Sequence, residues 1–379
     1  MPQIEISGLW KLFGRQPKLA SDALKAGADP EQVQGRYGCR AAVREVDLSI
    51  EAGEIFVVMG LSGSGKSTLL RMLNGLISPS AGKVIVEGQQ LSALRPAQLR
   101  QLRRNTMAMV FQSFALLPGR SALENAAFGL EVGGVPRAQR LERARSALER
   151  VGLGGDLNKR PEELSGGMQQ RVGLARALAL NPPILLMDEA FSALDPLIRR
   201  EMQDLLLDLQ RDQRRTVVFI SHDLDEAIRL GDRIALMQDG SVLQCGSSRE
   251  LLCHPANERV RHFFRDVDAS SVLSVDAIAV TAPWMVQQRD VDKLRDQPPH
   301  AGTGVAYVLD ETQRFCGLMP AGGSFIPAEK VEQLTAGTSL KEAMEPIART
   351  AHPVPVVSAD GQLLGVLSSR QLLQAMVMA

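Results

Sequence analysis

The sequence of 379 residues has few cysteines, and they form no recognisable pattern. Cys39, Cys245, Cys253 and Cys316 include no C-x-x-C pair, and no histidine stands at ligand spacing from them. These absences argue against a zinc site and a disulfide framework and favour a reduced compartment.

The sequence also lacks an excess of either charge, with 43 Lys and Arg residues against 43 Asp and Glu residues. A nucleic-acid-binding chain typically has a basic excess, so the balance argues against that class of partner. From Asp266 onward there are 8 basic and 13 acidic residues. The C-terminal part is therefore a mildly acidic unit of its own rather than a basic arm.

Long apolar runs are missing as well. No uncharged apolar stretch reaches the ~20 residues that a membrane span needs. Residues 1–5, MPQIE, lack the basic and then apolar build of a signal peptide. We therefore expect a cytoplasmic protein, and any membrane-spanning helices that it works with belong to another chain.

Strand-like and helical patterns alternate along the first two thirds of the chain. Apolar runs at 56–59, 108–111, 184–187, 217–220 and 234–237 are separated by helical patterns, which is typical of a parallel sheet in an α/β domain. Residues 16–40 predict a small helical insert between two early strands. We place the domain boundary after residue 265, which leaves residues 266–379 as a smaller α+β domain.

That smaller domain contains a strand–turn–strand–helix pattern. It consists of the apolar run 353–357, a turn at Asp360 and Gly361, a strand at 363–367 and a helix at 371–376. A fainter copy covers residues 305–319. The repetition indicates an internal duplication whose first half is degenerate.

The strongest chemical signal is GLSGSGKS at residues 60–67, which matches the phosphate-loop pattern G-x-x-x-x-G-K-[ST]. It follows a strand-like run and precedes a helical one. Glycines let successive backbone N–H groups point at phosphate oxygens, and the helix N-terminus adds partial positive charge. Lys66 is expected to reach the β- and γ-phosphates, and the Ser67 hydroxyl to bind Mg²⁺. A Gly/Ser-rich turn that merely carries a lysine is the structural alternative.

The sequence thus predicts binding of a nucleoside triphosphate. The residues expected to hold it here are Gly60, Ser62, Gly63, Ser64, Gly65, Lys66, Ser67 and Thr68.

Two carboxylates, Asp188 and Glu189, end the apolar run 184–187. A buried strand holds an acid most readily at its C-terminal edge, where nucleotide sites lie in open α/β sheets. We expect Asp188 to orient Mg²⁺ or its waters and Glu189 to take a proton from the attacking water.

Further motifs follow in an order that resembles one family. LSGGMQQR at 164–171 opens a helix with a Gly-Gly turn, which is an anion cradle, and it is similar to the signature of the ATP-binding-cassette (ABC) ATPases. Gln112, the segment SALD at 192–195 and His222 match the Q-loop, D-loop and switch histidine of that family. The matching motifs lie within residues 3–265.

The resemblance implies a fold: a P-loop NTPase cassette with a RecA-like parallel sheet core, an antiparallel β part and a helical subdomain. It also implies ATP and Mg²⁺ as cofactors and a head-to-tail homodimer of cassettes. Each ATP then lies between the phosphate loop of one chain and the signature of the other, for which the implied contacts are Ser165, Gly166, Gly167 and, from the D-loop, Asp195. The implied catalytic residues are Glu189, His222 and Gln112, and the implied metal ligands are Ser67, Gln112 and Asp188.

The aromatic residue that stacks on adenine has two candidates. In this family it lies upstream of the phosphate loop. Phe13 fits once the insert at 16–40 is discounted, whereas Tyr37 is nearer in sequence. Both stay open at this point.

A narrower resemblance comes from the insert and from the segments 59–67, 109–116 and 188–197. They are similar to the ATP-binding subunit of glycine betaine/L-proline, or quaternary-amine, importers. That subfamily carries two C-terminal CBS domains, which implies a tandem CBS regulatory module at 266–379. It further implies a place on the cytoplasmic face of the membrane, an integral-membrane permease and a periplasmic or lipid-anchored solute-binding protein as partners, and no nucleic acid.

Three alternatives bear on this interpretation. A soluble ABC ATPase that acts on nucleic acid or ribosomes usually has two cassettes or basic inserts, and this chain has neither. A non-hydrolysing module is disfavoured because the phosphate loop, both carboxylates and His222 are all there. In the tail, nucleotide-binding CBS domains place an acid three residues after Ser or Thr, whereas Ser368 is followed there by Gln371. Sensing of ionic strength, sensing of another ligand and a purely structural role therefore all remain open.

Overall fold

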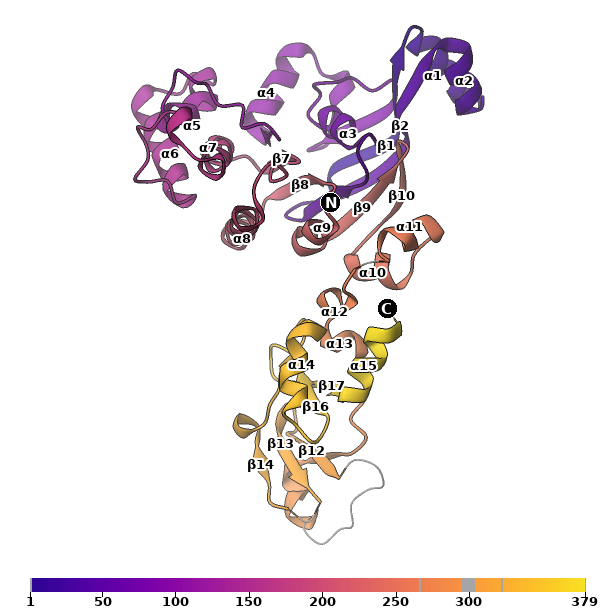
Figure 1. Cartoon of the computed structure of the whole chain (residues 1–379), viewed down its shortest axis with the longest axis vertical. Helices are drawn as coiled ribbons and strands as arrows, with labels where there is room; N and C mark the ends of the chain where they lie inside the picture. The colour runs from indigo at the N-terminus through magenta and orange to yellow at the C-terminus, as the bar shows by residue number, and fades with distance from the viewer. Residues whose placement is uncertain (1, 266, 295–303, 322, 379) are drawn as a thin grey trace. The chain divides into compact units, whose positions relative to one another are not determined.

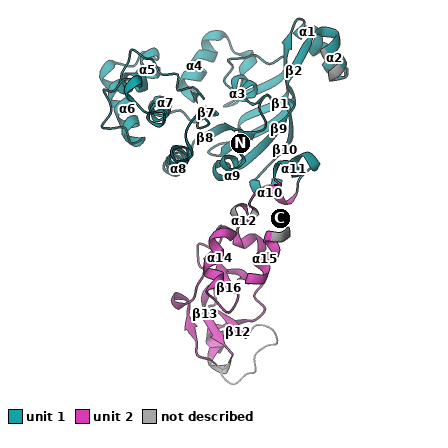
Figure 2. Ribbon diagram, viewed as in Figure 1, with its two compact units in different colours: residues 1–251, 255–264 teal, residues 252–254, 265–379 magenta. Residues whose placement is uncertain are grey.

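The computed structural model describes residues 2–265, 267–294, 304–321 and 323–378 (Figure 1). The chain divides into two compact units (Figure 2). Unit 1 contains residues 1–251 and 255–264, and unit 2 contains residues 252–254 and 265–379. Each unit has hydrophobic cores of its own, so each is described separately below.

A six-stranded sheet of order β10-β9-β3-β8-β7-β6 forms the centre of unit 1. All neighbours in it are parallel except β10, which is antiparallel to β9. Its strands are β3 (Ile55–Met59), β6 (Met107–Val110), β7 (Ile184–Asp188), β8 (Thr216–Ser221), β9 (Arg233–Gln238) and β10 (Ser241–Gly246).

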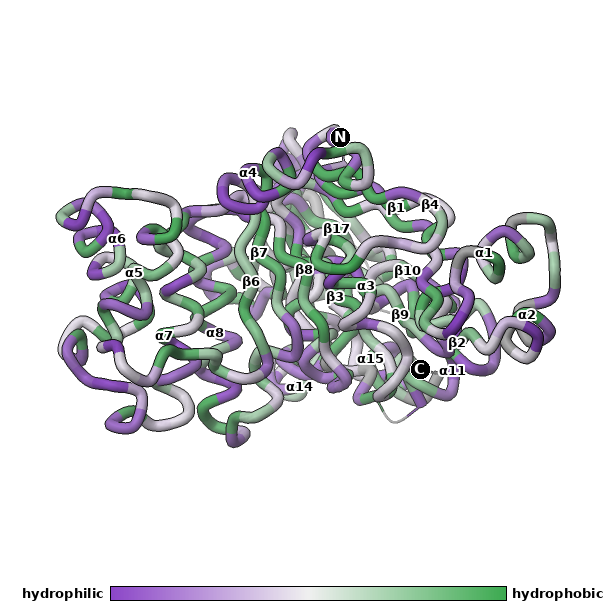
Figure 3. Tube along the Cα trace, turned by 90° about the horizontal axis from the view of Figure 1, so that it is seen from above, coloured by the Kyte–Doolittle hydropathy of each residue, from purple (hydrophilic) through white to green (hydrophobic). Residues whose placement is uncertain are grey.

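The predicted parallel sheet is therefore confirmed. Strands that are covered on both faces need nearly continuous apolar residues, and every residue of β3, β7 and β8 is buried. Figure 3 shows these strands as hydrophobic, whereas hydrophilic residues lie along α6. The sequence did not predict β10, because its residues are mostly half-buried and carry no strong apolar pattern.

A second, antiparallel sheet of order β2-β1-β4-β5 completes the β part of unit 1. Buried side chains such as Val46 of this sheet, Val58 of β3 and Leu70 of α3 share one hydrophobic core, so α3 is fixed between the two sheets. The strands are β1 (Pro2–Gly14), β2 (Cys39–Glu51), β4 (Ala81–Val86) and β5 (Gln89–Gln90).

Two helices, α1 (Pro17–Lys25) and α2 (Pro30–Tyr37), connect β1 to β2 in the region where the sequence predicted an insert. The remaining helices of unit 1 include α5, α6 and α7, which lie together at the far end of the six-stranded sheet (Figure 1). These helices are α3 (Lys66–Leu73), α4 (Pro96–Thr106), α5 (Ala122–Val132), α6 (Arg137–Arg150), α7 (Gly166–Ala179), α8 (Pro196–Asp212), α9 (Leu224–Leu230), α10 (Ser248–Cys253), which continues into unit 2, and α11 (Glu258–Phe263).

Unit 2 contains two small sheets, of orders β11-β12-β13-β14 and β15-β16-β17. An isolated bridge joins Val280 to Val366, and one hydrophobic core includes Tyr307 of the first sheet and Val357 of the second. The elements are α12 (Ala269–Val272), α13 (Val275–Ile278), β11 (Met285–Gln287), β12 (Val305–Leu309), β13 (Phe315–Pro320), β14 (Ile326–Pro327), β15 (Leu334–Thr335), α14 (Leu340–Ala348), β16 (Val354–Val357), β17 (Leu363–Leu367) and α15 (Ser369–Met378).

Within the described residues, none of the helices combines the length and the apolar character that crossing a membrane requires.

Candidate nucleotide site

The loop at 60–65 connects the end of β3 to the start of α3. Gly60 and Gly65 have φ angles of 154° and 101°, which side chains rarely tolerate. A Cβ atom at Gly60 would lie 2.1 Å from the carbonyl oxygen of Met237, and one at Gly65 would lie 2.1 Å from that of Ala42. The loop is therefore held between β9 and β2 so closely that only glycine fits at these two positions.

Lys66 is the first residue of α3, and it is almost fully buried. Its Nζ donates hydrogen bonds to the carbonyl oxygens of Gly60, at 2.8 Å, and Leu61, at 3.0 Å. Burial lowers the pKa of Lys66, while the nearby carboxylates Glu189 and Asp188 oppose that shift. The ammonium group thus lies on the inner side of the loop, where it can contact a bound anion.

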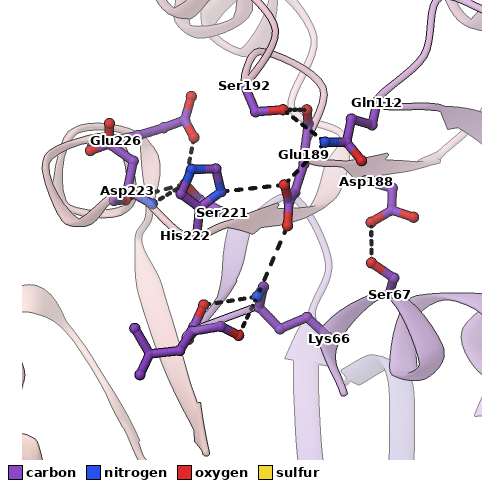
Figure 4. Close-up of polar contacts among 12 residues, drawn as sticks. Lys66, Ser67, Gln112, Asp188, Glu189, Ser192, Ser221, His222, Asp223 and Glu226 are labelled. Carbon is purple, nitrogen blue, oxygen red and sulfur yellow. Dashed lines mark hydrogen bonds and ion pairs between the residues drawn. The ribbon is translucent and has the colours of Figure 1, made fainter. Parts of the chain in front are cut away.

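Ser67 and Asp188 place two side-chain oxygens next to each other at the C-terminal end of β7. The Ser67 hydroxyl donates to Asp188 Oδ1 at 2.7 Å, and Arg71 Nη2 lies 3.9 Å from Asp188 Oδ2 (Figure 4). No group of three or more His, Cys, Asp and Glu residues suited to a metal occurs in the described part of the chain. This donor set fits Mg²⁺, which commonly takes one or two protein oxygens and completes its shell with phosphates and water.

Glu189 is the point at which the predicted catalytic residues meet. Its Oε1 lies 4.0 Å from Lys66 Nζ, and its Oε2 lies 3.3 Å from His222 Nδ1 and 3.5 Å from Gln112 Nε2 (Figure 4). Gln112 Nε2 also lies 3.4 Å from Ser192 Oγ in the D-loop. Three segments that are far apart in the sequence therefore converge on the carboxylate of Glu189.

A set of polar residues behind His222 was not identified from the sequence. The Ser221 hydroxyl donates to the buried carboxylate of Glu226, which also accepts from Gln203 Nε2 at 3.2 Å. Asp223 caps α9 by accepting from the backbone N–H of Glu226 at 3.1 Å. Burial raises the pKa of Glu226. The D-x-x-E spacing of Asp223 and Glu226 was the available sequence signal, because it is a helix-capping pattern.

An open cavity of about 600 Å³ lies beside the phosphate loop. Nine of the predicted residues line it: Phe13, Ser62, Gly63, Gly65, Lys66, Ser67, Thr68, Gln112 and Glu189. Arg40 and Ala42 line it too, and neither residue belongs to one of the sequence motifs. Gly60, Asp188 and His222 reach the same site through the contacts described above, whereas Ser64 has a buried hydroxyl with no hydrogen-bond partner among the described residues.

The two aromatic candidates lie in different places. Phe13 lines the cavity, and its ring is about half exposed. Tyr37 packs instead against the small core of the insert and contacts the guanidinium of Arg36. In one chain, the structure thus brings Phe13 rather than Tyr37 to the cavity.

The signature and D-loop residues are not among those that line the cavity. Ser165 caps α7 by accepting from the backbone N–H of Met168 at 3.3 Å, and Asp195 caps α8 by accepting from that of Ile198 at 3.1 Å. Gly166 and Gly167 form the first turn of α7. Within the described residues, these groups therefore lie outside the cavity beside the phosphate loop of their own chain.

Comparison with family models gives two matches. The ABC transporter family matches residues 43–192, which include the phosphate loop, the signature and both carboxylates. The CBS domain family matches residues 324–378, which cover β14, β15, α14, β16, β17 and α15.

Among curated proteins, the glycine betaine/proline betaine transport system ATP-binding protein ProV of Salmonella typhimurium is 45% identical over 396 residues, covering 99% of this chain and 97% of the relative. The glycine betaine/carnitine transport ATP-binding protein GbuA of Listeria monocytogenes is 43% identical, covering 99% and 98%. Among solved structures, a dimeric bacterial ABC transporter cassette matches with a TM-score of 0.54 and 34% identity, covering 64% of this chain and 98% of that one.

Proposed function

Because this chain belongs to the ABC transporter ATP-binding proteins that carry a CBS domain, we propose that it is the ATP-hydrolysing subunit of an importer for quaternary-amine compatible solutes. The candidate solutes are glycine betaine, proline and choline. The similarity to betaine transport proteins extends along 99% of the chain, tail included. The proposed solute class rests on this similarity along nearly the whole chain.

For the reaction, we propose that ATP lies in the cavity beside the phosphate loop with its base on Phe13. Lys66 and the backbone N–H groups of the loop then hold the β- and γ-phosphates. Ser67, Asp188 and Gln112 would hold Mg²⁺, which supplies positive charge against the phosphate oxygens. The cavity lining and the Ser67–Asp188 hydrogen bond support this placement.

Glu189 is proposed as the general base. It accepts the proton of a water whose oxygen attacks the γ-phosphorus, and the bond to the leaving oxygen of ADP breaks. His222, on one side of this carboxylate, and Gln112, on the other, orient it, as their contacts of 3.3 and 3.5 Å suggest. Phosphoryl transfer depends mainly on positioning and charge, which this arrangement supplies.

The second half of each nucleotide site is proposed to come from a second copy of the chain. Ser165, Gly166, Gly167 and Asp195 carry a helix N-terminus and short polar groups, and they do not line the cavity of their own chain. A head-to-tail homodimer would bring them to the partner's γ-phosphate. A cassette at 34% identity was itself solved as a dimer.

Partners and location follow from the transporter family. ATP-binding subunits of such systems work with a membrane permease, so we propose a peripheral place on the cytoplasmic face of the membrane. A periplasmic or lipid-anchored solute-binding protein would deliver the solute through the complex. We propose no nucleic-acid partner, and the similarity to transport subunits favours this over an ABC ATPase that acts on nucleic acid or ribosomes.

We also propose that residues 1–265 are the ATPase domain, with a helical insert at about 16–40, and that residues 266–379 are a tandem CBS module with a degenerate first half. The two small sheets of unit 2 support a duplicated arrangement. Gln371, at the position where nucleotide-binding CBS domains carry an acid, instead accepts from the Ser368 hydroxyl at 2.7 Å. That contact supports a helix-capping role for Gln371.

One experiment tests the proposed function directly. The chain is co-expressed with its permease, reconstituted in vesicles, and assayed for ATP turnover with the solute-binding protein loaded by glycine betaine, proline, choline or an unrelated amino acid. We expect a quaternary amine to stimulate turnover and uptake together. Stimulation by the unrelated amino acid alone, or no copurifying permease, would contradict the proposal.

A further inference from the structure

Arg40 is the second residue of β2, directly after the insert, where β2 pairs with β1. Its cross-strand partner is Phe13, so the two side chains point to the same face of the sheet. The next pair is Gly14 and Cys39, and a Cβ atom at Gly14 would lie 2.3 Å from the carbonyl oxygen of Gly38. The two strands are therefore closed tightly beside the pair formed by Phe13 and Arg40.

The insert fixes this end of the two strands from the other side. Cys39 is buried in a small core that also contains Leu12, Ala20 and Val33, drawn from β1, α1 and α2. Two flanking strand residues, Leu12 and Cys39, thus anchor the backbone on which Phe13 and Arg40 stand. A fixed backbone limits where the Arg40 side chain reaches.

The side chain of Arg40 has an unusual combination of position and contacts. It lines the cavity beside the phosphate loop, and its residue is exposed. Within the described residues, its guanidinium makes no hydrogen bond or ion pair. The other cation that lines the cavity, Lys66, already donates to two carbonyl oxygens of the loop.

The Phe13 ring is held from one side. Lys11 Nζ lies 5.0 Å from its ring centroid and donates to the carbonyl oxygen of Ser78 at 2.7 Å. An ammonium over one face leaves the other face for a stacked base. A nucleotide whose base stacks there, and whose terminal phosphates reach Lys66, must pass its ribose and α-phosphate between these two points.

We propose that Arg40 is a nucleotide-binding residue that donates to the α-phosphate and ribose of the bound nucleotide. The inference rests on the proposed placement of ATP in this cavity. A guanidinium suits the task because its planar fork binds two oxygens of a phosphate at once, which a lysine cannot reproduce. Arg40 is not part of the phosphate-loop machinery, and its expected contribution is affinity rather than proton transfer.

The experiment compares ligands with and without the nucleoside half. Binding of ADP and of inorganic pyrophosphate to the purified full chain is measured by calorimetry for the parent, Arg40→Ala and Arg40→Lys. Pyrophosphate offers phosphates to the loop but has no α-phosphate ester or ribose. The matched control is Arg36→Ala, which removes an exposed arginine of the insert that does not line the cavity.

We expect Arg40→Ala to weaken ADP binding about tenfold, the loss typical of one charge-assisted hydrogen bond. Pyrophosphate binding should change by less than about twofold, Arg40→Lys should recover only part of the loss, and Arg36→Ala should match the parent. Unchanged ADP binding, or equal losses for ADP and pyrophosphate, would overturn the proposal. Equal losses for ADP and pyrophosphate would show that the charge of Arg40 attracts any anion in the cavity and makes no specific contact with the nucleoside half.

The placement of ATP is tested separately in the same assay. Lys66→Ala should lose affinity for both ligands if the phosphates lie in the loop. Parent-like binding of both by Lys66→Ala would contradict the placement itself, whatever Arg40 does.

Discussion

Glu189 has a backbone conformation that a glutamate rarely adopts. Its φ angle is 46°, in the left-handed region that costs a non-glycine residue about 1–2 kcal/mol. Such strain persists only where surrounding contacts hold it, and it clusters at functional sites. Here the strained backbone conformation lies at the end of a buried strand, and the carboxylate that it carries contacts Lys66 and His222.

At this residue, we expect Glu189→Gln to keep ATP binding and to slow hydrolysis by at least ~10²-fold, the low end of general-base contributions. Glutamine keeps the shape of the side chain and its contacts with Gln112 and His222 but cannot accept a proton. Single-turnover hydrolysis and equilibrium ATP binding measure the two effects. The control is Glu142→Gln, an exposed change on α6 outside the cavity. Near-parent turnover in Glu189→Gln would rule out its role as the base.

Glu226 leads to a prediction on pH and stability. Its pKa is raised in the folded chain, first by burial, although Ser221 and Gln203 partly oppose the shift and Asp223 and Arg199 also act on it. The folded state therefore binds this proton more tightly than the unfolded state. Its contribution to stability is greatest below the ordinary glutamate pKa and is lost as the pH rises through the raised value.

We expect Glu226→Gln to remove that loss, because glutamine is neutral at every pH and still accepts from Ser221. The free energy of unfolding is measured by denaturant titration from about pH 4 to 7 for the parent and the variant. The parent should lose stability relative to Glu226→Gln as the pH rises. A constant difference across this range would mean that Glu226 titrates normally.

At the scale of elements, three helices of unit 1 have N-termini that are capped by polar side chains of the predicted motifs or their neighbours. Asp223 caps α9 behind His222, while Ser165 and Asp195 cap α7 and α8. Each cap satisfies a backbone N–H and leaves the partial positive charge of the helix end available to an anion. The N-terminus of α7 has this property without lining the cavity of its own chain, which is why a second copy is proposed to use it.

We expect Ser165→Arg to act on the partner rather than on its own chain. A long cation at the start of α7 would block the facing γ-phosphate. Mixed dimers are formed from Ser165→Arg and Glu189→Gln subunits and their ATP turnover is compared with that of each variant mixed with the parent. In the mixed pair both defects fall on the same site, so one site should stay active. Turnover in which each chain hydrolyses independently of its partner's Ser165 would contradict the head-to-tail arrangement.

At the scale of the whole molecule, the cassette and the tail are distinct units. Every predicted site residue lies in unit 1, and the CBS match lies in unit 2. Residues 252–254 belong to unit 2 although they precede the end of unit 1, and Leu252 packs against the core of unit 2. Removal of the tail would therefore uncover this leucine.

We expect a chain cut after Asp268 to fold, bind ATP and pair with its permease, because the described cassette core contains no residue of the tail. The truncated chain should lose the regulation of transport. In reconstituted vesicles, its solute uptake should depend less on internal ionic strength than uptake by the full chain. Leu252→Ser in the truncated chain controls for association through the uncovered side chain. An unchanged salt response would leave the tail a structural role, and failure to fold would place the domain boundary elsewhere.

Much of the site was predictable because its motifs are local. The spacing within residues 60–67 identifies a phosphate loop. The two acids after an apolar run identify the end of a buried strand. Neither pattern needs information about residues distant in sequence. The parallel sheet was predictable for the same reason, since strands buried on both faces read as continuous apolar runs.

Other features were decided only by the tertiary structure. The convergence of Lys66, Gln112 and His222 on Glu189 depends on strand order, and the buried Glu226 depends on the packing of α8 against α9.

The sequence by itself determined the nucleotide chemistry and the α/β class, because both are written in short, contiguous spacings. It selected Phe13 as the aromatic residue for adenine but did not exclude Tyr37, and it gave Arg40 no role. Only the pairing of β1 with β2 across the insert brings Phe13 and Arg40 to the cavity and puts Tyr37 in the insert core. Strand register over an insertion depends on contacts between residues distant in sequence, and no local pattern records them.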